Sequence, residues 1–196
     1  MGNVRLGVPE KLALALRDAG GLRVFIETGT YKGGTTTWAA QHFPKVVTIE
    51  AHQPYHEKAK AAHWNFKNIS WVLGNSRTEL RVQLGKAHQP CLLWLDAHWC
   101  GNASYGHKIG EECPLMEELA AVTKDNYADE HAILIDDARL FEAPPPYPHD
   151  PKQWPTMVEI KRVLDGRVIV VHDDVIVAVP RRHGRIVLRW KEEGGG

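Results

Sequence analysis

Five carboxylates in this sequence share one setting: each stands at the end of a short apolar run of the kind that forms a buried strand. In parallel sheets the carboxyl ends of the strands meet at one edge, where ligands bind. Carboxylates in that position can accept hydroxyl groups, hold a cation or move a proton. The five are Glu27, Glu50, Asp96, Asp136 and Asp137.

The turn after Glu27 has the pattern E-x-G-x-x-x-G, with Gly29 and Gly33 ahead of a predicted helix over 35–43. Glycines permit close backbone approach, and the helix N-terminus supplies amide donors. The dinucleotide pattern G-x-G-x-x-G is absent from this turn. A carboxylate here would repel a pyrophosphate but would suit an ammonium group. The plainer alternative is a tight strand-to-helix turn without a ligand.

Glu50 follows about twenty residues later, where an acid can accept hydrogen bonds from both hydroxyls of a ribose. One ligand satisfies both acids, namely a nucleoside joined to an amino acid, and this combination points to S-adenosylmethionine. The alternative for Glu50 is a solvated strand end.

The elements that must position these residues alternate between strand-like and helical patterns. Three further runs follow one another near the C-terminus and predict antiparallel strands. Ser76 and Glu79 predict a capping box at the start of a helix. We therefore expect one domain over 1–196, an α/β doubly wound (Rossmann-like), mostly parallel seven-stranded sheet in three αβα layers with an antiparallel C-terminal edge. Eight strand-like runs are candidates for these seven strands: 22–27, 45–50, 69–73, 91–96 and 132–136, followed by 167–171, 174–179 and 185–190.

Over roughly residues 23–179 the sequence resembles the class I S-adenosylmethionine-dependent methyltransferases. The resemblance rests on "ETGTYKG", "TIE", "LGNS" and "WLDAHW", in that order and each at a strand end. It departs from the family at Asn75, where Asp is common; Asn can still bond the adenine amino group. The cofactor contacts that it implies are Glu27, Gly29, Tyr31, Gly33, Thr35, Thr36, Glu50, Ala51, Asn75, Ser76 and Asp96.

The acids of the fourth and fifth strands predict a metal site, because three converging carboxylates raise one another's pKa unless a cation neutralises them. Oxygen ligands favour Mg²⁺ or another hard divalent cation. The pattern is similar to the macrocin and novobiocin-sugar O-methyltransferases and the cephalosporin-hydroxylase-like proteins, which implies Asp96, Asp136 and Asp137 as ligands. The chain is shorter than those enzymes. Asp96 and His98 are the candidate catalytic residues, with His98 as the candidate base; the alternative for His98 is a hydrogen-bonded loop histidine.

A zinc or iron site using Asp96, His98, Cys100 and Cys113 is a weaker alternative, since nothing independent supports the cysteines. Two long loops, 98–112 and 138–155, leave from the strands that carry the acids. The first contains Tyr105, His107 and Lys108, and the second contains six prolines. We expect both to build the substrate pocket.

Composition narrows the partners. With 24 basic and 24 acidic side chains the formal net charge is zero, which argues against a dedicated nucleic-acid binder. No apolar run approaches the roughly 20 residues of a membrane span, and the N-terminus lacks a signal-peptide cleavage pattern. We expect a cytoplasmic protein with reduced thiols, and a homodimer is compatible with the sequence.

The function that these features predict is transfer of a methyl group from S-adenosylmethionine to a hydroxyl of a small molecule such as a sugar, with a divalent cation. The alternatives are a hydroxylase-like or redox enzyme on the same scaffold, a non-catalytic S-adenosylmethionine-binding protein and, last, a nicotinamide-dependent reductase.

Overall fold

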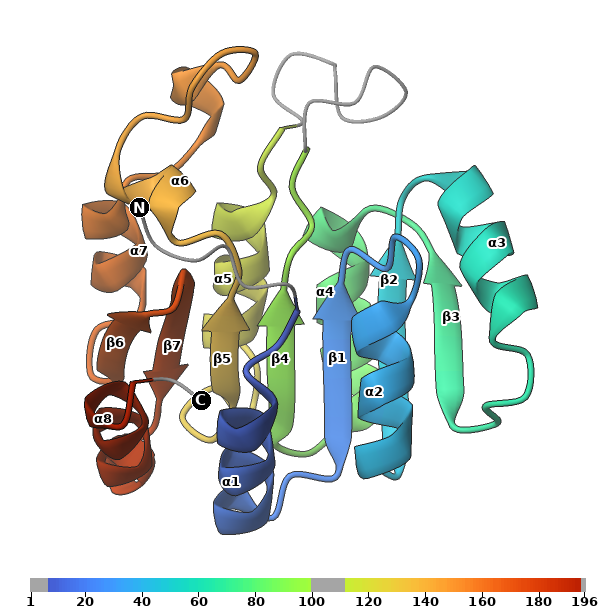
Figure 1. Ribbon diagram of the computed structural model, residues 1–196, viewed down its shortest axis with the longest axis horizontal. Coiled ribbons are helices and arrows are strands. Elements are labelled where there is room, and N and C mark those ends of the chain that lie inside the picture. The colour runs from blue at the N-terminus through green and yellow to red at the C-terminus, as the bar shows by residue number, and fades with distance from the viewer. Residues whose placement is uncertain (1–6, 100–111, 195–196) are drawn as a thin grey trace.

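The computed structural model describes residues 7–99 and 112–194 (Figure 1). The loop residues Tyr105, His107 and Lys108, together with Cys100, lie outside the described residues. Within the described ranges, no helix is long and apolar enough to cross a membrane.

One seven-stranded sheet forms the centre of the protein, in the order β3-β2-β1-β4-β5-β7-β6. Strands β1 to β5 pair in parallel, and β7 runs antiparallel to both β5 and β6. This confirms the predicted mixed sheet with an antiparallel C-terminal edge. The strands are β1 Val24–Thr28, β2 Lys45–Glu50, β3 Ile69–Leu73, β4 Cys91–Leu95, β5 Ala132–Ile135, β6 Val168–His172 and β7 Val175–Val179.

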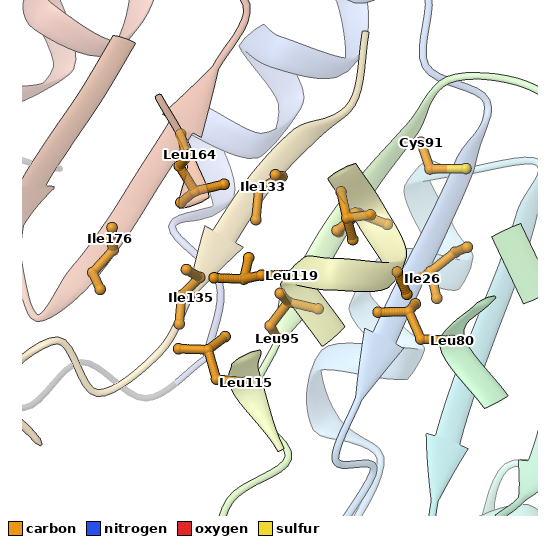
Figure 2. Packing of buried hydrophobic residues seen from close by; sticks show 14 of the residues in the cluster. Ile26, Leu80, Cys91, Leu95, Leu115, Leu119, Ile133, Ile135, Leu164 and Ile176 are labelled. Carbon is orange, nitrogen blue, oxygen red and sulfur yellow. The ribbon is translucent and has the colours of Figure 1, made fainter. Parts of the chain in front are cut away.

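Helices cover both faces of the sheet, which gives the predicted three layers (Figure 1). Helices α4, α5 and α7 pack on one face through a cluster that includes Leu80, Leu119 and Ile160. Figure 2 shows Leu80 and Leu119 in this cluster. Helices α1, α2 and α8 cover the other face. The helices are α1 Glu10–Gly20, α2 Gly34–His42, α3 Gln53–Ala62, α4 Ser76–Ala87, α5 Leu115–Thr123, α6 Arg139–Glu142, α7 Met157–Val163 and α8 Gly184–Glu192, with 3-10 turns at Pro151–Gln153 and Arg181–His183.

The central strands are largely apolar because both of their faces are buried. In β1, Phe25 packs into the cluster under α1 and α2, while Val24 and Ile26 pack on the opposite side. Side chains alternate between the faces of a strand, so a strand covered on both sides carries apolar residues at successive positions. The polar residues Glu27 and Thr28 stand at the carboxyl end of β1.

The prediction of a strand over 185–190 is wrong, because this segment belongs to helix α8. Val187 and Trp190 are three residues apart and buried, whereas Leu188 and Arg189 are exposed. Six residues with this pattern fit either a helix or a strand, and packing against α1 and β6 decides for the helix.

The predicted capping box at Ser76 and Glu79 is also wrong. Asn75 is the N-cap of α4, and its side chain accepts a hydrogen bond from the Arg77 backbone N–H at 3.0 Å. A capping box does form at α7, between Thr156 and Glu159.

Gly29 joins the first strand to the fourth. Its backbone is left-handed, with φ +83°, and a Cβ added there would lie 2.4 Å from the carbonyl oxygen of Asp96. The absent side chain therefore lets the ends of β1 and β4 meet.

We predict that Gly29→Ala lowers the free energy of unfolding by more than about 2 kcal/mol, through backbone strain plus overlap with Asp96. Gly34→Ala is the control, because its Cβ meets nothing within 4 Å and it lies in the first turn of α2. Alanine there should stabilise the protein by about 0.5–1 kcal/mol. Urea denaturation of both variants measures the difference; equal effects would contradict the role given to Gly29.

Candidate functional site

The predicted site residues come together at the carboxyl ends of β1, β2, β4 and β5. The topological switch point of the sheet lies here, because β1 pairs with β2 on one side and with β4 on the other. A cavity of about 380 Å³ lies there. A second cavity of about 490 Å³ shares Gly29, Tyr31, Asp96 and Asp137 with it. The first cavity is lined by Gly29, Tyr31, Ile49, Glu50, Ala51, Tyr55, Gly74, Ser76, Asp96, Ala97, His98 and Asp137.

The glycine turn is fixed by hydrogen bonds to the second strand. The Gly29 N–H donates to the carbonyl of Ile49 at 2.9 Å, and the Tyr31 N–H donates to the Glu50 carboxylate at 2.9 Å. Gly33 closes the turn by donating to the Thr30 carbonyl at 2.8 Å. The turn is thus shaped by the protein before any ligand binds.

Glu50 is held with its carboxylate at the wall of the first cavity. Oε2 accepts from the Tyr31 N–H at 2.9 Å, and Oε1 accepts from the His52 N–H at 2.8 Å. A carboxylate offers about four acceptor positions, so each oxygen can take a further hydroxyl. This geometry suits a vicinal diol in the cavity.

Glu27 faces the second cavity instead of the first. It is buried, and its Oε2 accepts hydrogen bonds from the hydroxyls of Thr36 and Thr48, the latter at 2.6 Å. Burial raises the pKa of Glu27 to about 7, against the effect of both hydroxyls. Within the described chain these bonds leave Oε1 for a ligand, and a cationic group there would favour the ionised form.

The remaining predicted cofactor residues fall into two groups. Ala51 and Ser76 line the first cavity and Thr35 lines the second. Thr36 is buried and holds Glu27, and Asn75 caps α4. Gly33, with φ +79°, is the N-cap of α2, where a Cβ would lie 3.0 Å from the ring of His63. For these three residues the structure shows a structural role.

Beyond β4 and β5, the structure brings Asp96, His98 and Asp137 together. The Nε2 atom of His98 lies 2.7 Å from Oδ2 of Asp137, and its Nδ1 atom lies 3.7 Å from Oδ1 of Asp96. One ligand atom from each residue lies within 4.8 Å of the others, which is close enough to share a metal ion. Asp136 lies outside that group of described residues; its Oδ1 accepts the Asp137 N–H at 2.8 Å and it lines the second cavity.

The charges of this group depend on one another. Burial acts to raise the pKa of Asp137, but the hydrogen bond and charge of His98 and the charge of Arg139 outweigh burial and lower it. Burial acts to lower the pKa of His98, but Asp137 and Asp96 together raise it. The pKa of Asp136 rises to about 7 and that of Asp96 rises as well, mainly through burial. About a third of the Asp96 side chain (32%) remains exposed, so water still screens its charge.

Arg139 is the main site residue that sequence reasoning missed. Its Nη1 donates to Oδ1 of Asp137 at 2.5 Å, and its side chain lines the second cavity. The sequence offered only its position two residues after the acidic pair. Ile49, Tyr55 and Gly74 were also missed, because nothing in their types distinguishes a cavity wall from a core or a surface.

The alternative metal set with cysteines gains no support. Cys113 is buried and burial raises the pKa of its thiol to about 12, which disfavours the thiolate that binds metals. The group of potential ligands formed by the described residues contains Asp96, His98 and Asp137 without Cys113.

The proline-rich segment 138–155 contains helix α6 near its start and the 3-10 turn Pro151–Gln153 near its end. Trp154 is buried, and its ring centroid lies 5.5 Å from that of His98. Its indole N–H donates to Glu112 at 2.8 Å. The end of the segment is therefore attached beside the acidic group.

A further buried acid is Glu118 of α5, whose carboxyl group lies near the side chains of Ser76 and Thr28. Burial raises its pKa from 4.5 to about 7, against the opposing effect of both hydroxyl groups. The folded protein therefore keeps a proton that the unfolded chain releases between these two pH values, and stability falls as the pH rises through this window.

We predict that Glu118→Gln becomes more stable relative to the wild type as the pH is raised from 5 to 8, by up to roughly 3 kcal/mol. Glutamine keeps an acceptor for Ser76 and cannot ionise. Glu117→Gln, at an exposed neighbour on the same helix, is the control. Chemical denaturation at both pH values gives the numbers; a pH-independent difference for Glu118→Gln would contradict the buried-acid account.

No family model and no curated protein sequence matches this chain. Solved structures do resemble it. The O-methyltransferase TomG from Streptomyces achromogenes, in complex with S-adenosylmethionine, aligns with a TM-score of 0.56 at 16% identity, covering 91% of this chain and 82% of that chain. An O-methyltransferase from Bacillus cereus, in complex with S-adenosylhomocysteine, aligns with 0.52 at 17% identity over 90% and 83%.

The N-methyltransferase NodS from Bradyrhizobium japonicum is also similar, with a TM-score of 0.51 at 11% identity over 88% of this chain and 94% of that chain. At these identities the likeness concerns the fold. This chain has the fold of the class I S-adenosylmethionine-dependent methyltransferases. The similar structures include O- and N-methyltransferases, and the fold by itself decides neither an activity nor an acceptor.

Proposed function

We propose that this protein is an S-adenosylmethionine-dependent methyltransferase that acts on a hydroxyl group of a small molecule, with a divalent cation at Asp96 and Asp137. The observation that carries the proposal is Glu50, a carboxylate fixed by two backbone N–H groups at the wall of the first cavity. Its free acceptor positions match the two hydroxyls of a ribose.

The cavities fit the rest of the cofactor. Ser76, Ala51 and Tyr55 line the first cavity around Glu50 and would surround the adenosine part. The two cavities meet at Gly29, and Glu27 and Thr35 line the second, where an amino-acid end would lie. Glu27 would accept the ammonium group at the same turn. A pyrophosphate would meet a buried acid there, which disfavours the nicotinamide alternative.

When bound, S-adenosylmethionine supplies an electrophilic methyl group. The residues of this chain then have to deprotonate the acceptor and align it with that methyl group. Asp96 and Asp137 line both cavities, so the acceptor hydroxyl would be held at the point where the cavities meet.

The donor set of Asp96, Asp137 and His98 fits a divalent cation, since two carboxylates and an imidazole lie within 4.8 Å. Such a cation supplies positive charge that lowers the pKa of an acceptor hydroxyl. Asp136 is the predicted third acid and would support Asp137 through its backbone N–H. An acceptor such as a sugar offers the hydroxyls that this site would bind.

His98 offers a second way to remove the proton. With Nε2 donating to Asp137 at 2.7 Å, Nδ1 has no hydrogen bond to Asp96, which is 3.7 Å away, and can take a proton from the acceptor. Asp137 would then hold the imidazole in that tautomer. The cation and His98 are alternatives for one step, and they can be separated by experiment.

We predict that S-adenosylhomocysteine binds and raises the melting temperature, because a ligand specific for the folded state stabilises it. Glu50→Gln should weaken this affinity by about 1.5–3 kcal/mol through the loss of charged acceptors. Glu57→Gln, on the exposed side of α3, is the matched control and should bind normally. Isothermal titration calorimetry measures the affinity of both variants for S-adenosylhomocysteine. A melting temperature that rises with NAD but not with S-adenosylhomocysteine would refute the cofactor assignment.

We also predict that chelation abolishes methyl transfer and leaves S-adenosylhomocysteine affinity unchanged, because Glu50 and Glu27 hold the cofactor from other strands. Transfer of label from methyl-labelled S-adenosylmethionine to a small-molecule extract is the assay, and added Mg²⁺ should restore it. Full transfer in excess EDTA, with no metal found by elemental analysis, would exclude the cation.

Under those metal-free conditions, His98→Gln tests the second route. A loss of methyl-transfer turnover of about 10²–10⁴-fold in this variant would assign the base to His98.

A further inference from the structure

Arg139 lies between two acids that are far apart in the sequence. Its Nη1 donates to Oδ1 of Asp137 at 2.5 Å and also to Oδ2 of Asp174. Asp137 follows β5, whereas Asp174 belongs to the turn between β6 and β7. The guanidinium thus links the acidic group of the site to a hairpin at the antiparallel end of the sheet.

Asp174 also accepts two hydrogen bonds from the backbone that follows Asp137. Its Oδ1 accepts the Arg139 N–H at 2.9 Å, and its carbonyl accepts the Ala138 N–H at 2.8 Å. Asp173 and Asp174 have φ of 48° and 62°, the left-handed conformation that two-residue hairpin turns require. The hairpin therefore presents Asp174 to the two residues that follow Asp137.

The contact between Asp174 and Arg139 affects which partner each carboxylate oxygen of Asp137 binds. Asp137 itself has φ 56°, an unfavourable conformation for a residue other than glycine, and it needs support from its neighbours. Its Oδ1 goes to Arg139 and its Oδ2 goes to His98. A guanidinium can take both oxygens of a carboxylate. Because Asp174 engages Nη1, Arg139 is kept in a position that leaves Oδ2 for His98.

We infer that Asp174 is a positioning residue of the site, which acts through Arg139 to orient Asp137 toward His98. The expected effect on catalysis rests on the proposed function. The contacts among Asp174, Arg139, Asp137 and His98 do not depend on which acceptor is methylated.

Asp174→Asn tests the inference, because asparagine keeps the size of the side chain, tolerates the left-handed turn and removes the charge that binds Arg139. We expect methyl-transfer turnover to fall about 10–100-fold, as for other residues that orient a ligand or base, with an unchanged KM for S-adenosylmethionine. Asp173→Asn is the matched control: it makes the same change on the same turn, where the carboxylate lies 3.5 Å from His172. Equal losses in both variants would overturn the inference.

A double-mutant cycle tests the route through Arg139. If Asp174 acts through Arg139, the variant combining Asp174→Asn with Arg139→Ala should be no worse than Arg139→Ala alone. If the two substitutions reduce turnover independently, so that their fold losses multiply in the double variant, Asp174 does not act through Arg139. Melting temperatures of all variants show whether they are folded.

The ¹⁵N resonance of His98 Nε2, assigned with His98→Gln, gives a readout that needs no acceptor. It should move in Asp174→Asn and in Arg139→Ala but stay in place in Asp173→Asn. An unmoved resonance in Asp174→Asn overturns the inference. If the wild type transfers no methyl group, the proposed function fails, while this spectrum still decides the role of Asp174.

Discussion

The close contact between the ends of β1 and β4 is the constraint on which the site depends. Gly29 lies against the Asp96 carbonyl with no room for a Cβ, and the Asp96 N–H donates to the Thr28 carbonyl at 3.1 Å. The glycine turn and Asp96 therefore occupy one place at the sheet edge. Both cavities meet there, so a ligand held by Glu50 would extend directly to the acids beyond β4.

Charge compensation is the second organising feature. Asp96, Asp136 and Asp137 crowd one end of the cavities, and the sequence suggested that only a cation from solution could balance them. The structure adds two nitrogen donors from the protein, the His98 imidazole and the Arg139 guanidinium, on opposite oxygens of Asp137. A divalent cation would have to share Asp137 with both. The orientation of this one carboxylate thus connects the metal, the candidate base and the hairpin that carries Asp174.

Sequence reasoning predicted what depends on local pattern. Strand ends are visible as apolar runs that stop at an acid, so Glu50, Asp96 and Asp137 were found. What depends on packing was not visible. The partnership of Arg139 and Asp174 spans 35 residues and exists because β7 pairs with β5. The same limit applies to 185–190, whose short pattern fits a helix or a strand until its neighbours are known.

The central claim is that the Glu50 carboxylate accepts hydrogen bonds from the ribose hydroxyls of an S-adenosyl ligand. A crystal structure with S-adenosylhomocysteine tests this claim most directly. The account predicts both ribose hydroxyls within about 2.5–3.0 Å of the Glu50 carboxylate oxygens, with the amino-acid end near Glu27 and Thr35. A ligand bound elsewhere, or one whose ribose lies away from Glu50, would contradict the account.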